Sequence, residues 1–208
     1  VANSMAIPKA DRGSVNQAFL GWTAELEGEP VSLGTVIGQS EGGFQATLTS
    51  PLGYFVADLI RSSAETDGAL VKANHFPADF VTGDITVYDL FRAYPLPFTV
   101  GVASIKGADL VRMIALVNGE PQYYPSGVDV VYGGNGGEGG VVESMIGGKP
   151  IDLRVDYTIA IEYGASSALE LSGVRVRDTG VRIRDLFGRH IRTSESVKGV
   201  VDGRIQRR

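Results

Sequence analysis

The side chains that could bind a catalytic metal, histidines and carboxylates, do not cluster in this sequence. The chain has two histidines, His75 and His190, and neither has a cluster of His or Asp beside it. Metal-dependent hydrolysis needs several such ligands that converge on one or two ions. We therefore expect no metal ion to be bound by this chain alone.

Nucleophilic catalysis and a phosphate-binding loop are not indicated either. The two histidines are isolated, which leaves a serine triad without an evident base, and the chain has no cysteine, so neither a serine triad nor thiol chemistry is expected. The glycine-rich stretch 133–140 lacks the Lys-Ser/Thr pair of a phosphate loop and lies between two predicted strands. It is typical of a flexible hairpin tip. Catalysis within this chain is therefore not expected.

Composition and charge exclude other classes of partner. The 208 residues are 43% hydrophobic, which is enough for one substantial core. A net charge of -5 argues against a nucleic-acid backbone as partner, since phosphate neutralisation needs clustered Lys and Arg. The most basic stretch, Arg175–Arg192, is interrupted by acidic and apolar residues and is typical of a solvated strand and helix. No run approaches the apolar length of a membrane span.

The first 34 residues are predicted to lead into the domain. Residues 1–13 lack periodicity and are interpreted as a linker. Ser14 stands at a helix N-cap position, apolar residues follow it at helical spacing as far as Leu26, and Gly28 and Pro30 would end the helix. We predict a linker and connecting helix over 1–34 and a single domain over 35–208.

Within the domain, helices and strands interleave first, and strands dominate later. Apolar periodicity and turn residues predict helices at 52–63, 86–93, 107–117 and 183–192, and strands at 35–37, 44–48, 69–73, 99–105, 128–132, 141–146, 157–162 and 200–205. This order predicts an α+β class with a mixed β-sheet flanked by helices.

Short motifs in a fixed order carry a family resemblance from about Val36 to Ile205. In chain order they are the segments 50–60 (with Leu52, Gly53 and Asp58 at a helix start), 83–90 (G-D-I-T-V-Y-D-L), 97–98 (P-F), 105–110 (I-K-G-A-D-L), 126–128 (S-G-V), 146–152 (I-G-G-K-P-I-D), 156–160 (D-Y-T-I-A) and 201–205 (V-D-G-R-I). These motifs and their order resemble those of the carboxy-terminal domain of 5'-nucleotidases and the related periplasmic nucleotide phosphodiesterases.

The resemblance implies a partner domain. In that family a connecting helix joins this domain to a catalytic metallophosphoesterase domain, which would end just before Val1. Divalent metals and phosphoester hydrolysis would then belong to that N-terminal domain or to a partner protein, and this chain would need no cofactor of its own. The resemblance also implies an extracellular or periplasmic location.

The resemblance also indicates where a substrate would be recognised. The family's carboxy-terminal domain holds phosphate or carboxylate groups with arginines and sandwiches the nucleobase between two aromatic rings. Here Asn74 and His75 open the corresponding loop, but Asp79 stands where the arginine is expected, and an aspartate repels phosphate. Phe98 corresponds to the first ring. The loop of the second ring, 164–171, has no aromatic residue, and Tyr163 is the nearest candidate to replace it.

Three hypotheses follow. The first is a degenerate, non-catalytic domain kept as a scaffold or interaction module. The second is the recognition half of a metal-dependent phosphoesterase with altered specificity, its pocket lined by His75, Asp79 and Tyr163. The third is self-assembly through the strand-rich second half. Restoring an arginine at Asp79 and an aromatic ring at Leu169 would separate the first two.

Overall fold

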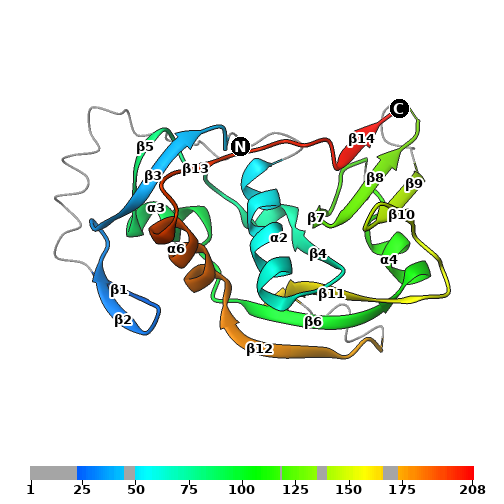
Figure 1. Ribbon diagram of the computed structural model, residues 1–208, viewed down its shortest axis with the longest axis horizontal. Coiled ribbons are helices and arrows are strands. Elements are labelled where there is room, and N and C mark those ends of the chain that lie inside the picture. The colour runs from blue at the N-terminus through cyan, green and yellow to red at the C-terminus, as the bar shows by residue number, and fades with distance from the viewer. Residues whose placement is uncertain (1–22, 45–49, 118, 135–139, 166–172) are drawn as a thin grey trace.

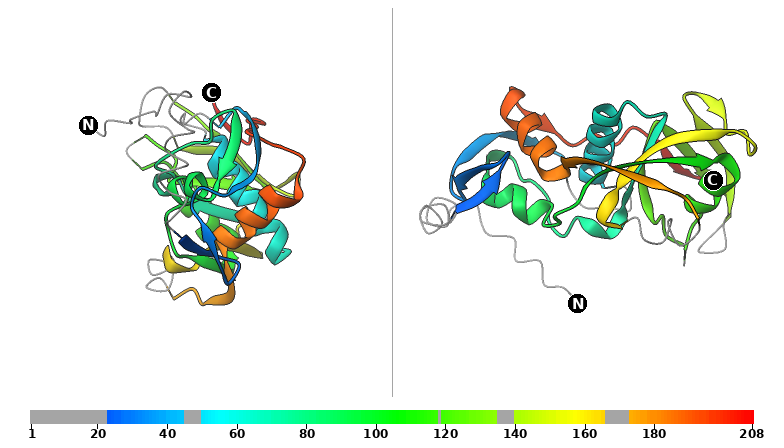
Figure 2. Two further views of the ribbon diagram at one scale, coloured as in Figure 1. Left: turned by 90° about the vertical axis from the view of Figure 1, so that its left-hand side faces the viewer. Right: turned by 90° about the horizontal axis from the view of Figure 1, so that it is seen from below.

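A mixed five-stranded sheet organises the molecule. The computed structural model describes residues 23–44, 50–117, 119–134, 140–165 and 173–208. The strand order is β12-β6-β11-β4-β7, and β11 runs parallel to β4 but antiparallel to β6. Figures 1 and 2 show β6, β11 and β12 running along one side of the molecule. The bounds are β4 Gly68–Lys72, β6 Thr99–Lys106, β7 Tyr123–Ser126, β11 Asp156–Glu162 and β12 Val176–Arg182. The predicted α+β class and mixed sheet are confirmed.

Two smaller sheets flank this one. The first has the order β13-β3-β5 and the second the order β10-β9-β8-β14. Their bounds are β3 Val36–Gly42, β5 Gly83–Thr86, β13 Val197–Lys198, β8 Val128–Tyr132, β9 Val141–Ile146, β10 Lys149–Pro150 and β14 Ile205–Arg207. The antiparallel β8–β9 hairpin confirms the predicted pair of strands. Its glycine-rich tip, 135–139, lies outside the described residues.

Four α-helices pack on these sheets in the described part of the chain. They are α2 Pro51–Ala64, α3 Val87–Ala93, α4 Gly107–Met113 and α6 Ile183–Thr193, with short 3-10 turns η2 Ala73–His75 and η3 Tyr163–Ala165. The Ser50 side chain caps α2, and Thr86 and Asp89 form a capping box on α3. Both caps fix a helix start that the sequence predicted to within one residue.

Helix α4 is shorter than predicted. The periodicity suggested a helix as far as Val117, but α4 ends at Met113. Val117 instead forms an isolated antiparallel bridge with Glu120. The chain must turn there to enter β7, and the turn takes precedence over the helical pattern.

The predicted helix through Leu26 is wrong over its described part. Thr23–Leu26 forms β1, which pairs antiparallel with β2, Glu29–Ser32. Glu27 and Gly28, at the turn, both have positive φ, 55° and 85°, as a two-residue hairpin turn requires. Leu26 is buried and would be buried in a helix or in a hairpin, so the spacing of the apolar residues did not distinguish the two. The rest of that helix, 14–22, and the division of the chain at residue 34 stay predictions.

The last strand also begins later in the chain than predicted. Residues 200–204 form an irregular connecting segment, which we call the strap, and β14 begins at Ile205. The strap crosses the upper side of the molecule from β13 to β14 (Figure 1). Val200 and Val201 on it are more than half exposed, so β-branched residues here do not mark a buried strand.

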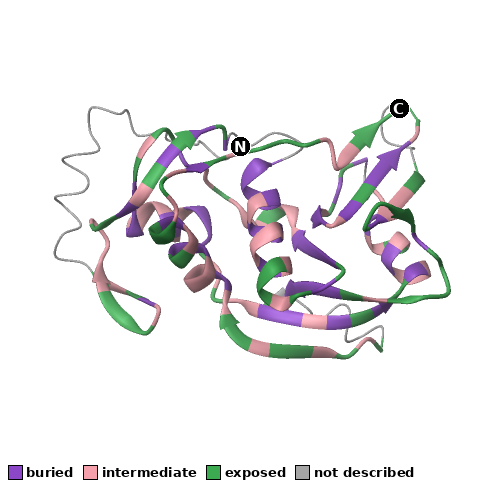
Figure 3. Cartoon of the chain, viewed as in Figure 1, coloured by how far each residue is buried: buried purple, intermediate pink, exposed green. Residues whose placement is uncertain are grey.

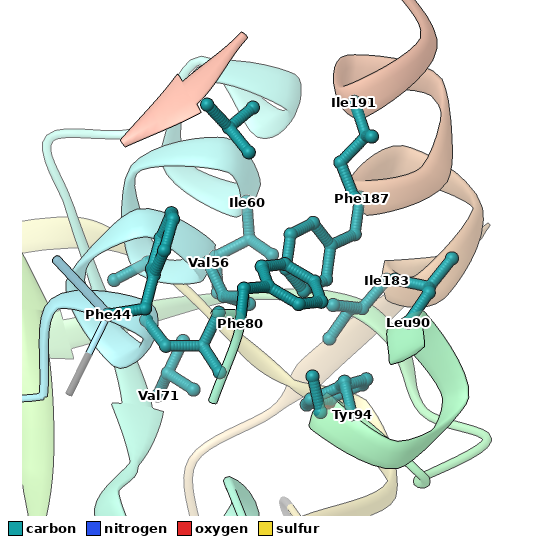
Figure 4. Packing of buried hydrophobic residues seen from close by; sticks show 14 of the residues in the cluster. Phe44, Val56, Ile60, Val71, Phe80, Leu90, Tyr94, Ile183, Phe187 and Ile191 are labelled. Carbon is teal, nitrogen blue, oxygen red and sulfur yellow. The ribbon is translucent and has the colours of Figure 1, made fainter. Parts of the chain in front are cut away.

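Two hydrophobic clusters lie on opposite faces of the five-stranded sheet. Successive side chains of a strand point to opposite faces, and in β4 Ala69 and Val71 join one cluster while Leu70 joins the other. Figure 4 shows the first cluster, where Val56 and Ile60 of α2 lie near Phe187 of α6. The central strand β4 is buried along almost its whole length, whereas the edge strand β12 is mostly exposed (Figure 3).

Helix α2 buries one face fully and a neighbouring one in part. Val56 and Ile60 are fully buried, while Phe55 and Leu59 are only partly buried at the edge of the same cluster. Phe55 instead packs edge-on against His190 of α6, with ring centroids 5.0 Å apart. This contact joins α2 to α6.

Replacing Gly107 by Ala should destabilise the fold. A Cβ at Gly107 would lie 2.1 Å from the carbonyl oxygen of Asp152, and the Gly107 and Ala108 N–H groups donate to the carbonyls of Val155 and Leu153. Because the clash is with backbone, we expect the free energy of unfolding to fall by about 1–3 kcal/mol in urea denaturation. Gly140→Ala, where a Cβ meets nothing within 4 Å, is the matched control. Equal stability of the two variants would contradict this packing.

Acid should weaken the α2–α6 contact through His190. Burial lowers the pKa of His190, so the folded state disfavours the charged imidazole. This contribution is complete above about pH 6.5, the unfolded pKa, and is lost as the pH falls through the lower folded pKa. We expect urea midpoints to fall between neutral and mildly acidic pH more steeply for the wild type than for His190→Phe. Parallel pH profiles would contradict the assignment.

Candidate functional site

A buried carboxylate, Glu162, lies at the end of β11 and is hydrogen-bonded to groups from three other segments. Its side chain is 2% exposed. The Tyr94 hydroxyl donates to Oε1 at 2.6 Å, and the backbone N–H of Lys72 donates to Oε2 at 2.9 Å. His75 Nδ1 lies 3.0 Å from Oε1 and 2.9 Å from Oε2. We call Glu162, His75 and Tyr94 the Glu162 cluster.

The cluster fixes the orientation of His75. Since a carboxylate accepts hydrogen bonds, the proton of the His75 ring belongs on Nδ1, which leaves Nε2 as an acceptor when the ring is neutral. The His75 side chain is 14% exposed. Its ring centroid lies 5.5 Å from that of Phe98. The structure therefore brings together two of the predicted site residues, His75 and Phe98.

The ring of Phe98 is partly buried and lies against backbone. A Cβ built on Gly164 would lie 1.9 Å from Phe98 Cδ1, so Gly164 lies directly against the ring. His75 contacts the same ring with a tilt of 56°. A planar base could not occupy the space beside Phe98 that Gly164 fills unless the chain at Gly164 moved away.

The loop that carries Phe98 is also held by Arg184 of α6. Its Nε donates to the carbonyl of Tyr94 at 3.1 Å, and a terminal nitrogen donates to that of Leu96 at 3.2 Å. The guanidinium also lies 3.8 Å from the ring centroid of Phe91. Burial and the neighbouring Glu162 charge together raise the pKa of Tyr94 above its usual range. Tyr94 therefore acts as a neutral hydrogen-bond donor.

The other predicted site residues lie around this cluster without joining it. Asn74 is exposed in η2, next to His75, and Tyr163 follows Glu162 as a half-buried residue of η3. Asp79 is half-buried, and its carbonyl accepts a long hydrogen bond of 3.5 Å from Arg92. The loop between His75 and Asp79 is anchored by Phe76, whose ring packs against Tyr94 and Tyr124 at 5.7 and 6.1 Å.

Sequence reasoning missed Glu162 and Tyr94. Glu162 ends an apolar strand, where a charged residue normally reaches solvent, and Tyr94 follows a short helix as an ordinary core residue. Buried acidic residues are rare unless they are paired, but no spacing in the sequence pairs Glu162 with His75, 87 residues away. An acidic residue inside a buried run is the only signal that could have pointed to the cluster.

In the part of the chain that the structure describes, no three His, Cys, Asp or Glu side chains lie close enough together to hold a metal ion. No helix in the same residues is long and apolar enough to cross a membrane.

Comparison with known sequences adds a family and a relative. Residues 36–170 match the model of the 5'-nucleotidase C-terminal domain family. Endonuclease YhcR of Bacillus subtilis (strain 168) is 30% identical over 145 residues, which are 66% of this chain and 12% of that protein.

Solved structures share the fold. The 5'-nucleotidase precursor from Thermus thermophilus has a TM-score of 0.72 at 20% identity over 83% of this chain and 39% of that one. A putative 5'-nucleotidase from Staphylococcus aureus, in complex with α-ketoglutarate, has a TM-score of 0.66 at 18% identity over 99% of this chain and 45% of that one. The NAD nucleotidase of Haemophilus influenzae has a TM-score of 0.65 at 13% identity over 83% of this chain and 38% of that one.

This chain therefore spans less than half the length of each of these proteins. Its match to the family model nevertheless covers more than half of its own residues and includes the segment from β3 through the Glu162 cluster. The chain belongs to the 5'-nucleotidase C-terminal domain family.

Proposed function

We propose that this chain is a non-catalytic 5'-nucleotidase C-terminal domain that has lost nucleotide recognition and acts as a scaffold or interaction module. The observation that carries the proposal is the packing around the ring of Phe98. Gly164 and His75 both lie against this ring, and the buried Glu162 carboxylate fixes the position of His75. A residue that would stack on a base is thus partly taken up by contacts within the domain.

The charge of the site supports the same proposal. Asp79 stands where the family resemblance calls for an arginine, and its charge helps to raise the pKa of Tyr124 after the larger effect of burial. Glu162 adds a second carboxylate beneath the loop. Two acidic groups near a phosphate would repel it, since like charges in a partly buried site interact strongly.

The proposal places catalysis elsewhere in a longer protein. Members of this family usually pair this domain with a metallophosphoesterase domain. We propose that such a domain, or a separate partner protein, supplies the divalent metals and hydrolyses phosphoesters in nucleotide breakdown. We also propose an extracellular or periplasmic location for the whole protein.

One observation favours a second candidate function, the recognition half of a phosphoesterase with altered specificity. His75 presents Nε2, a hydrogen-bond acceptor when neutral, from a side chain that is 14% exposed, and exposed Asn74 lies beside it. Such groups suit a polar substrate that carries little negative charge. The B. subtilis relative is named an endonuclease, which is compatible with phosphoester cleavage by the whole protein.

Nucleotide titration tests the proposed loss of recognition. We expect AMP to give no binding heat with the wild type up to about 1 mM in isothermal calorimetry. Asp79→Arg combined with Leu169→Tyr should gain measurable affinity, because it adds a phosphate ligand and a stacking ring; Leu169 itself lies outside the described residues. Asp129→Arg with Leu169→Tyr, which makes the same charge change at exposed Asp129 on β8, is the control.

Submillimolar binding of AMP by the wild type would overturn the proposal and favour the second function. Equal binding by the repaired variant and its control would show that the added charge acts without a site. In that case the correspondence between Asp79 and the family's arginine would be wrong.

The Glu162 cluster should behave as a structural unit. Tyr94→Phe removes the donor to Glu162 and leaves a buried carboxylate oxygen one hydrogen bond short, so the free energy of unfolding should fall by about 1–3 kcal/mol in urea denaturation. Tyr123→Phe, on neighbouring β7, removes a hydroxyl that does not bond to Glu162 and should have little effect. If Tyr94→Phe is as stable as the control, Glu162 does not depend on that bond.

A further inference from the structure

Strand β12 forms one edge of the five-stranded sheet. Among the described residues it pairs only with β6, through Val176, Arg177 and Asp178 and, after an irregularity, Arg182. The opposite edge of β12 therefore has no strand beside it in the described part of the chain. Figure 1 shows β12 below β6, at the lower side of the molecule.

The open edge carries two arginines on its outer face. Along 174–177 the residues alternate, with Val174 and Val176 packed against the second hydrophobic cluster and Arg175 and Arg177 exposed. Neither guanidinium forms an ion pair or hydrogen bond with the described residues, whereas Arg182, at the end of the strand, is paired with Glu25 and Asp185. A chain with a net charge of -5 thus presents two unneutralised positive charges side by side.

A bulge limits the length of this edge. The Gly180 N–H donates to the Asp178 carboxylate at 2.9 Å, and the Val181 N–H donates to the Thr179 hydroxyl at 3.2 Å. The Thr179 hydroxyl in turn donates to the carbonyl of Val100 at 2.7 Å. These turns satisfy the backbone locally and close the edge beyond Arg177. In the described part of the chain, Val176 and Arg177 at the start of the strand have no such local hydrogen bonds on their outer edge.

A hollow of about 460 Å³ lies beside the open part of the strand. Its lining among the described residues is Gly173, Val174, Arg175 and Val176. This segment thus offers backbone hydrogen-bonding groups and apolar contacts next to Arg175.

The charges decide what could occupy the edge. A second copy of this chain that paired antiparallel through the same strand would bring its own Arg175 and Arg177 against the first pair, and like charges across a strand pair are destabilising. An extended segment with acidic residues at alternate positions would place carboxylates against both guanidinium groups while its backbone pairs with β12.

We propose that the start of β12, together with residues 174 and 175 that lead into it, is a docking site for an extended acidic segment of a partner protein, which adds to the sheet as a sixth strand. The inference deepens the proposed role as an interaction module and rests on it. It uses no residue of the Glu162 cluster, so nucleotide titration and peptide binding can fail independently of each other.

A short acetylated peptide of alternating Glu and Val, labelled for fluorescence anisotropy, tests the proposal with the full chain at low salt. We expect saturable binding that weakens about tenfold or more in the double variant Arg175→Glu/Arg177→Glu and falls as salt is added. The double variant Arg112→Glu/Arg154→Glu, at side chains that are 76% and 91% exposed, makes the same charge change elsewhere and should bind almost as the wild type does.

A second peptide separates strand addition from simple charge attraction. Replacing every Val by Pro keeps the carboxylates but removes the backbone N–H groups that a strand needs, so its affinity should be about tenfold lower. The proposal is overturned if neither peptide binds, if both bind equally, or if Arg175→Glu/Arg177→Glu has no effect. Dimerisation of the wild type that this double variant abolishes would also overturn it and assign the edge to a second copy.

Discussion

The carboxylate of Glu162 is the point at which four separate parts of the chain are tied together. It ends β11, takes one hydrogen bond from the backbone of Lys72 at the end of β4, and receives the side chains of His75 and Tyr94. A buried carboxylate is costly unless each oxygen is satisfied. The positions of the 73–79 loop and of the segment after α3 therefore follow from the need to complete this one group.

The same constraint explains why the face of the domain near Phe98 does not resemble a site built to stack a base. His75 must stay close to Glu162, and from that position it contacts Phe98. Arg184 also binds the Phe98 loop, through the carbonyl groups of Tyr94 and Leu96. The loop is thus held by both His75 and Arg184, and a domain fixed in this way is well suited to presenting surfaces such as the β12 edge.

A second polar junction holds the carboxy-terminal strap against α2. The Arg204 guanidinium binds both carboxylate oxygens of Asp58, at 2.7 and 3.2 Å, and also contacts Asp202 and the carbonyl of Pro125. It lies 4.7 Å from the ring centroid of Tyr54. Asp58 and Arg204 belong to two motifs that open and close the family pattern, so their pairing gives a physical reason for keeping both.

The sequence by itself determined the elements whose signals are local. The capping residues Ser50 and Thr86, the apolar run of β4 and the alternation of β6 depend on neighbours a few residues away, and the order of short motifs indicated the family. The tertiary structure alone decided the rest. Leu26 is buried in either a helix or a hairpin, and only the positive φ at Glu27 and Gly28 allows the hairpin. Glu162 meets His75 and Tyr94 because sheet pairing brings distant segments together, and a local pattern carries no information about such contacts.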